Sequence, residues 1–328
     1  MKKLLLIFCV TTSVLTAEAQ QLPQYSSYMI NNYVLNPAVT GSNDYFEAKA
    51  LNRYQWKGID DAPRTYVVSV HGPSKKYNMG FGGFVFSDVT GPTSRTGGYI
   101  TYAYHLKLKE GLKLNFGLAA GFLQFKIDGT RITTKTSDPI LNGGVMAAYQ
   151  PDFNFGLYLN HEKFYVGFAC NQLIGNKLKF FKDQQNIRSN LDRHFLLSGG
   201  YNLAIGSKLI MQPSFMLKYV APVPVQIEGG LQIKYNDFVW LGATYRHNDA
   251  VSALLGFNIK DLVLVGYSYD FATTRLRSYS SGTHEIMVGA KFGRIKSKVI
   301  EPQVVPETVP EATPGEPQKD DSKTEEPK

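Results

Sequence analysis

The stretch that most constrains the fold is residues 261–294, because both of its halves alternate in hydrophobicity. From Val263 to Phe271 the odd-numbered positions are apolar or aromatic, and most even-numbered positions are small or polar. From His284 to Phe292 the even-numbered positions form the more apolar set. Side chains of a strand point alternately to its two faces, so each half is predicted to be a strand with one apolar face. A transmembrane β-barrel and a soluble β-sandwich both contain such strands.

The same pattern predicts fourteen antiparallel strands between Asp44 and Arg294. The expected strands are 44–56, 63–72, 77–88, 94–107, 110–126, 152–161, 163–170, 192–205, 207–219, 223–236, 237–246, 250–259, 261–271 and 283–294. The pattern is irregular around Phe122–Phe125, where a β-bulge is expected.

The lengths of the connections separate a barrel from a sandwich. Every connection after an even-numbered strand is short, whereas most of those after odd-numbered strands are longer, with exceptions at 220–222 and 247–249. The longer ones are expected at 57–62, 89–93, 126–151, 171–191 and 272–282. Short turns on one rim and long loops on the other are typical of outer-membrane barrels, whose turns face the periplasm. With an even number of strands, both termini are expected on the periplasmic side.

The first residues predict export. Lys2 and Lys3 precede a short apolar run, and Ala17-Glu18-Ala19 resembles a cleavage site, so cleavage is expected between Ala19 and Gln20. No stretch of the chain approaches the 18 consecutive apolar residues of a membrane-spanning helix. The remaining cysteine of the mature chain, Cys170, lies on an expected strand and is interpreted as a packing residue.

The chain divides into four expected parts. Residues 1–19 are a signal peptide, and residues 20–43 lie in the periplasm or enter the lumen as a plug. Residues 44–294 form the barrel, and residues 295–328 are a disordered periplasmic tail, since 301–328 are rich in proline and carry eight acids against three lysines. The remaining body is strongly basic, which suits anionic lipid or acidic partners, whereas export excludes nucleic acid.

No pattern indicates catalysis. The histidines lack metal-ligand spacing, and no phosphate-binding loop occurs, so the sequence predicts no catalytic residue, no metal and no cofactor. Charged residues on inward-facing positions predict an ionic network in the wall or a selectivity lining. We expect Asp270 and Glu285 to lie near each other, with Arg246, Arg275 or Arg277 between them pinning the loop 272–282 over the lumen; the alternative is a solvated loop with no fixed partner.

Six stretches resemble the PorP/SprF family of type IX secretion system membrane proteins. They are 23–41 with its NPAVTG, 53–73 (RYQWKGIDDAPRTYVVSVHGP), 88–105, 213–225, 240–257 and 267–285. The positions that carry the resemblance are Asn36, Pro37, Gln55, Trp56, Gly58, Pro63, His71, Gly91, Pro92, Lys218, Tyr267, Tyr269, Gly282 and His284. The acidic tail departs from the family pattern.

This resemblance implies a non-enzymatic outer-membrane β-barrel that works with type IX secretion. The implied partners are a periplasmic ring of the PorK/PorN kind, or a secreted client with a C-terminal sorting domain, such as a gliding adhesin. The alternative function is an outer-membrane channel or transporter for small solutes, because fourteen strands enclose a real lumen.

Overall fold

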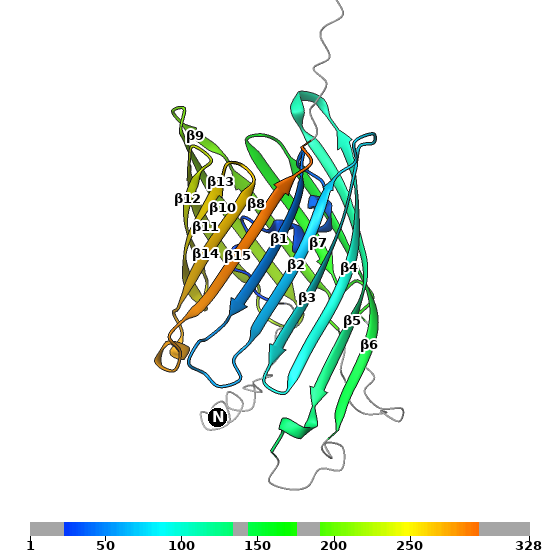
Figure 1. Cartoon of the computed structure of the whole chain (residues 1–328), viewed down its shortest axis with the longest axis vertical. Helices are drawn as coiled ribbons and strands as arrows, with labels where there is room; N and C mark the ends of the chain where they lie inside the picture. Colours follow the sequence, from blue (N-terminus) through cyan, green and yellow to red (C-terminus); the bar gives the residue numbers. More distant parts are fainter. Residues whose placement is uncertain (1–22, 134–143, 176–190, 295–328) are drawn as a thin grey trace, which may run out of the picture. The chain divides into compact units, whose positions relative to one another are not determined.

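The computed structural model describes residues 23–133, 144–175 and 191–294, in which antiparallel strands close into one barrel (Figure 1). Each strand pairs with its neighbours in sequence, except that β8 and β9 both pair with β10, and β15 closes the ring on β1. The strands are β1 (Phe46–Tyr54), β2 (Arg64–Pro73), β3 (Met79–Thr90), β4 (Thr93–Lys107), β5 (Lys113–Asp128), β6 (Val145–Asn160), β7 (Phe164–Asn171), β8 (His194–Tyr201), β9 (Leu203–Ile205), β10 (Leu209–Val220), β11 (Gln226–Tyr235), β12 (Val239–Arg246), β13 (Ala250–Ile259), β14 (Val263–Ala272) and β15 (Thr283–Phe292).

The short strands β8 and β9 are one interrupted strand. Both pair with the same edge of β10, and only Asn202 separates them. The wall seen in the described residues therefore has fourteen strands, and the predicted fold is confirmed. Closure leaves no open sheet edge, which is the condition for β-structure to sit in hydrocarbon.

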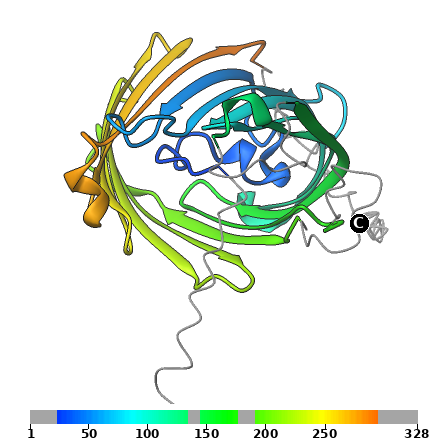
Figure 2. The ribbon, with the colours of Figure 1, turned by 90° about the horizontal axis from the view of Figure 1, so that it is seen from below.

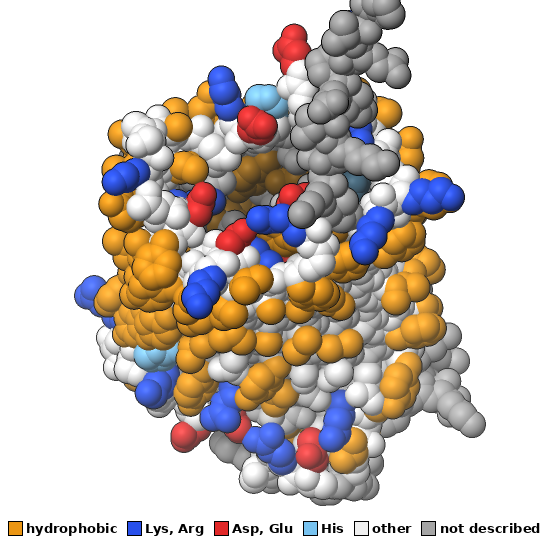
Figure 3. Space-filling model, turned by 45° about the horizontal axis from the view of Figure 1, so that its top comes forward, with side chains coloured by type: hydrophobic (Ala, Val, Ile, Leu, Met, Phe, Trp, Pro, Cys, Tyr) orange, Lys and Arg blue, Asp and Glu red, His pale blue; other side chains and the backbone are white. Residues whose placement is uncertain are grey.

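The alternation places one face of each strand outward. On β2, Tyr66, Val68 and Val70 are exposed, whereas Val67 and Ser69 are buried. The same reversal recurs around the ring, and Figure 3 shows the resulting band of hydrophobic side chains on the outer wall. No helix in the described part of the chain is long and apolar enough to span a bilayer.

The two rims differ as predicted, with corrections in detail. On the short-turn rim, the pairs Asn236-Asp237 and Lys260-Asp261 all have positive φ, as a tight hairpin turn requires. On the opposite rim, which we call the long-loop rim, β3 and β4 are joined only by Gly91-Pro92, so the longer connection expected at 89–93 is wrong. The tight turn forms because the ladder continues to the pair Thr90 and Thr93.

The β5–β6 hairpin is longer than the sequence suggested. The ladder continues to the pair Asp128 and Val145, so β6 begins seven residues before the expected start at 152. The pairing of β5 also runs without interruption through Phe122–Phe125, and the expected bulge is absent there. Phe122 faces outward, whereas Leu123 and Phe125 face inward, so the irregular pattern arises from aromatics on both faces of a regular strand.

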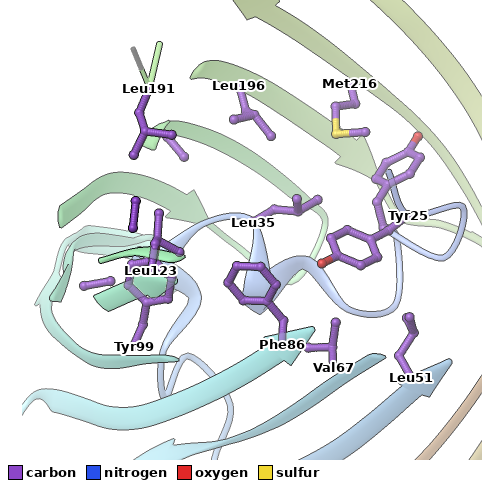
Figure 4. Packing of buried hydrophobic residues seen from close by; sticks show 14 residues of the cluster. Tyr25, Leu35, Leu51, Val67, Phe86, Tyr99, Leu123, Leu191, Leu196 and Met216 are labelled. Atoms are coloured by element: carbon purple, nitrogen blue, oxygen red, sulfur yellow. The ribbon is translucent and has the colours of Figure 1, made fainter. Parts of the chain in front are cut away.

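The segment Pro23–Gly41 lies inside the ring, and we call it the plug (Figure 2). It contains two short 3₁₀ helices, η1 (Asn32–Val34) and η2 (Pro37–Val39). The other 3₁₀ turns are η3 (Lys109–Gly111), η4 (Gly129–Arg131) and η6 (Arg275–Ser278). Tyr25 and Leu35 of the plug join the buried hydrophobic cluster with wall residues such as Phe86 (Figure 4). The hydrophobic core of this barrel is therefore the contact between plug and wall.

Candidate functional site

The middle of the plug is held by Asn36. Its side-chain oxygen accepts from the backbone N–H of Ala38 at 2.9 Å and caps η2. Its side-chain nitrogen donates to the carbonyl oxygens of Leu157 on β6, at 3.0 Å, and Phe168 on β7, at 3.3 Å. A strand inside a sheet has few backbone acceptors to spare, so these bonds fix Asn36 at one height in the barrel.

Wall glycines make room for this contact. Gly117 on β5 and Gly156 on β6 face each other in the ladder. A Cβ at Gly117 would lie 2.1 Å from the backbone nitrogen of Ala38, and one at Gly156 would lie 2.0 Å from Oδ1 of Asn36. Real Cβ atoms do not approach so closely, so no other residue fits at either position while the plug is in place. We call Gly117, Gly156 and Asn36 the seat.

Toward the short-turn rim, two histidines hold the end of the plug. His71 Nδ1 accepts from the backbone N–H of Gly41 at 3.1 Å, and His105 Nε2 donates to the carbonyl of Thr40 at 2.9 Å. The hydroxyls of Tyr33 and Thr101 are 2.7 Å apart. Burial raises the pKa of Tyr33, whose hydroxyl therefore stays neutral.

Toward the long-loop rim, the plug enters a buried group of charges that we call the ionic cluster: Arg53, Glu228, Arg246, Asp249, Asp270 and Glu285. Arg53 of β1 donates to Asp270 at 2.9 Å and to Glu285 at 3.0 Å. These three side chains are at most 4% exposed. One planar guanidinium thus bridges carboxylates of the last two strands and ties them to the first strand, across the line where the ring closes.

Arg246 organises the other half of the ionic cluster. It lies 2.9 Å from Glu228, 2.7 Å from Asp249 and 3.8 Å from Asp270. The ionic cluster therefore contains two buried guanidiniums, three buried carboxylates and the partly exposed carboxylate of Asp249, so its buried members carry one excess negative charge. Buried charge of one sign is costly unless other donors compensate it.

The plug supplies those donors. The backbone N–H groups of Ser26 and Ser27 donate to Glu285 at 3.0 Å each, and the Ser27 hydroxyl also donates to Glu285. The Ser26 hydroxyl donates to Asp270 at 2.7 Å and accepts from Arg53 at 2.8 Å. Plug and wall charges thus form one hydrogen-bonded unit.

The predicted network residues divide into two groups. Arg246, Asp270 and Glu285 come together as described above, but the guanidinium between the two carboxylates belongs to Arg53. Arg275 and Arg277 lie exposed on η6 and make no ion pair with any residue that the structure describes. Arg53 was not among the network residues predicted from the sequence. It stands two residues after Leu51 and four after Lys49, so the alternation of the strand could have placed it on the same inward face.

Backbone contacts hold the loop 272–282. Lys57 N–H donates to the Gly282 carbonyl at 2.8 Å, and Ser281 N–H donates to the Lys57 carbonyl at 2.7 Å. Trp56 N–H donates to the hydroxyl of Thr283 at 3.0 Å. The loop is therefore fastened to its neighbour 55–63 on the rim, and arginines do not pin it over the lumen.

The family-motif positions fall at the plug or at the long-loop rim. At the plug lie Asn36, Pro37, His71 and Lys218, whose ammonium donates to Gln24 at 2.7 Å. At the rim lie Gln55, Trp56, Gly58, Pro63, Gly91, Pro92, Tyr267, Tyr269, Gly282 and His284. The Tyr267 hydroxyl is 2.8 Å from His284, and Tyr269 donates to the Ser281 carbonyl. Ala19 and Gln20 lie outside the described residues.

The plug packs against the wall in the long-loop half of the lumen and also reaches toward the short-turn rim beside β2 and β4, where His71 and His105 hold it. Between the plug and the wall of the described residues lie a cavity of about 40 Å³ beside Tyr25 and one of about 10 Å³ beside Asn36. On the short-turn side a cavity of about 870 Å³ opens to the rim, and we call it the vestibule. Figure 3 shows this hollow, with charged side chains around its mouth. At its edge, a hydrogen bond from Lys291, joined by bonds from Asn258 and Arg294, lowers the pKa of Asp261 to about 2.

A fourteen-stranded wall, an apolar outer band and a polar, plugged lumen define an outer-membrane β-barrel. Residues 17–290 match the family model of the type IX secretion system membrane protein PorP/SprF. The chain belongs to this family, and is thereby associated with type IX secretion and its other components.

Solved structures of outer-membrane barrels are similar to the chain. The chain is similar to the toluene transporter TbuX of Ralstonia pickettii, with a TM-score of 0.51, 9% identity, and coverage of 80% of this chain and 93% of that one. A FadL homologue of Pseudomonas aeruginosa matches with a TM-score of 0.46, 12% identity, and coverage of 83% and 94%. At such identities the likeness to TbuX shows a shared barrel architecture alone. No curated protein matches the sequence.

Proposed function

We propose that this protein is a non-enzymatic component of type IX secretion that acts in export or surface anchoring of a secreted client, or couples the barrel to the periplasmic ring. The observation that carries the proposal is the closed lumen: the plug fills the long-loop half and forms a hydrogen-bonded unit with the ionic cluster. A barrel closed by its own chain is suited to holding partners at its rims.

The proposed orientation puts the short turns in the periplasm and the long loops outside, because outer-membrane barrels are built this way. The last strand ends at the short-turn rim, so the tail that follows Arg294 would be periplasmic. We propose residues 1–19 as the signal peptide, 20–43 as the plug segment, 44–294 as the barrel and 295–328 as the tail.

In this orientation the two rims have different tasks. The long-loop rim, with loops 55–63 and 272–282 fastened together, presents a fixed outer surface to a client. The short-turn rim and the vestibule face the PorK/PorN-like ring. No catalytic residue is proposed.

The experiment is complementation in a strain that lacks the protein. Wild type should restore export of proteins with C-terminal sorting domains, and it should co-purify with ring components or with one client. A loop variant carrying Ser281→Pro, which removes the N–H that donates to Lys57, should reach the outer membrane at normal levels but lose surface display of the client. Ser42→Ala, on the plug side, serves as the control.

The alternative function, a channel for small solutes, requires the plug to leave the lumen. Steady conductance of the purified wild-type barrel in a planar bilayer, together with normal export in the deletion strain, would replace the proposed function by the channel.

A further inference from the structure

We propose that the vestibule is a binding site for an acidic peptide segment of a periplasmic partner. The inference rests on the proposed function only for the side of the membrane that the vestibule faces. The site itself is built from residues of the short-turn rim and the plug, and nothing in its geometry depends on the orientation.

Cationic side chains outnumber acidic ones in the vestibule. The vestibule is lined by five cationic side chains, Lys49, Lys234, Lys260, Lys291 and Arg294, against three acidic ones, Glu47, Asp237 and Asp261. Most of these are already paired: Lys49 with Glu47 at 2.9 Å, and both Lys291 and Arg294 with Asp261 at 2.7 and 2.6 Å.

Two lysines, Lys234 and Lys260, and one carboxylate, Asp237, are left without an ion pair among the described residues. Neither Lys234 nor Lys260 lies within 4 Å of a carboxylate oxygen among the described residues. Both lysines line a cavity that is enclosed by the barrel wall and the plug. Such a low-dielectric enclosure concentrates the electric field of charges that have no partner. The ligand that complements the vestibule therefore carries carboxylates.

Much of the remaining lining of the vestibule consists of side-chain amides. Eight side-chain amides face the vestibule: Asn32, Asn43, Asn160, Asn202, Gln212, Gln232, Asn236 and Asn258. An amide both donates and accepts hydrogen bonds. A peptide backbone presents N–H and C=O groups in alternation, so a wall of amides can satisfy it in several registers. A small inorganic anion would leave most of this lining unused.

The size and depth of the vestibule also suit a peptide. About 870 Å³ lies at the upper end of the range for ligand sites, large enough for several residues of an extended chain. The floor is the plug itself, at Met29, Ile30 and Asn32. Lys49 holds the Ile30 carbonyl at 2.5 Å. The inner end of a peptide that enters from the rim would therefore contact the plug. Its binding would thus depend on the position of the plug.

The test uses the full-length protein in detergent and fluorescence anisotropy of a short labelled peptide in which glutamate alternates with threonine. The same peptide with glutamine in place of glutamate is the neutral probe. The double variant Lys234→Gln/Lys260→Gln removes the unpaired cations. The matched control is Lys75→Gln/Lys76→Gln, two lysines in the turn between β2 and β3 on the same rim that do not line the vestibule.

The expected result is binding of the acidic probe, with little binding of the neutral one, and an affinity loss of about tenfold or more in the vestibule double variant only. A photoreactive version of the probe should cross-link to residues 234–261 and to the plug. If both double variants lost affinity for the acidic probe equally, the binding would arise from the general charge of the rim, and the proposed site would be wrong. Absence of binding would contradict the site as well.

Two further outcomes name other occupants. A variant truncated after residue 300 that binds the probe several-fold more tightly would assign the vestibule to the acidic residues 301–328 of this chain, against a partner. If neutral glycan oligomers bound more tightly than the acidic probe, the assignment of an acidic peptide as the ligand would be wrong. Failure of export without any change in peptide binding would count against the proposed function alone.

Discussion

Replacing Gly156 by alanine should release the plug without breaking the barrel. The new Cβ would stand 2.0 Å from Oδ1 of Asn36, so either the strand or Asn36 must move. Overpacking of this kind costs about 1–3 kcal/mol. If Asn36 withdraws from the wall, its two hydrogen bonds to Leu157 and Phe168 are lost, at about 1 kcal/mol each. A total near 2 kcal/mol raises the unseated fraction about thirtyfold.

The assay is planar-bilayer conductance of the purified barrel combined with limited proteolysis. Gly156→Ala should show frequent openings and new cleavage sites within residues 23–41, whereas wild type stays closed and protected. The control is Gly229→Ala on β11, where an added Cβ meets nothing within 4 Å. If the Gly156→Ala barrel folds, stays closed and resists protease as wild type does, the seat does not hold the plug and the reasoning is refuted.

The remaining predictions concern the wall and the rim. Arg53→Met leaves the two carboxylates of β14 and β15 without their guanidinium and should lower the free energy of unfolding in urea by about 3–5 kcal/mol; an unchanged midpoint would mean that water replaces the arginine. Val288→Arg puts a charge on the lipid-facing side, 48% exposed, and should cost about 2–4 kcal/mol in assembly, seen as less heat-modifiable barrel. Gly289→Ser, on the inner face, should be milder, and equal assembly of the two variants would contradict the assigned faces. The lowered pKa of Asp261 implies stability that is present above its unfolded value of about 3.9 and is lost as the pH falls toward about 2. In Asp261→Asn, the melting temperature should therefore fall less between pH of about 4 and about 2 than in wild type. Parallel curves of melting temperature against pH for the two proteins would show that the Asp261–Lys291 pair is not the source of this pH dependence.

Most of the wall could be predicted from the sequence because period-two alternation and turn chemistry are local. The strand from Thr283 to Phe292 and the tight turn at Asn236-Asp237 need only neighbouring residues to be recognised. The extension of β6 to Val145 was missed because the pairing with β5, and not local hydrophobicity, sets its length.

The site was less accessible to sequence reasoning for the same physical reason. Asp270 and Glu285 were placed together by the hairpin between them, but their partner Arg53 lies 217 and 232 positions away in the chain. The donors Ser26 and Ser27 belong to a segment with no periodicity. Only closure of the ring brings these groups together, and no local pattern records that.

The plug also constrains the order of biogenesis. Ser26 bonds Glu285 across 259 positions, so the first described segment of the chain completes its contacts only when the last strand is in place. Contacts of such sequence separation form late, since the loop-closure entropy must be overcome before they can stabilise anything. Until β15 meets β1, the N-terminal segment has no partners in the ionic cluster and remains available to proteases and chaperones. Burial of this segment therefore distinguishes a finished barrel from an unfinished one, and a quality-control factor that recognises the free segment would sense completion of the wall without touching the wall itself.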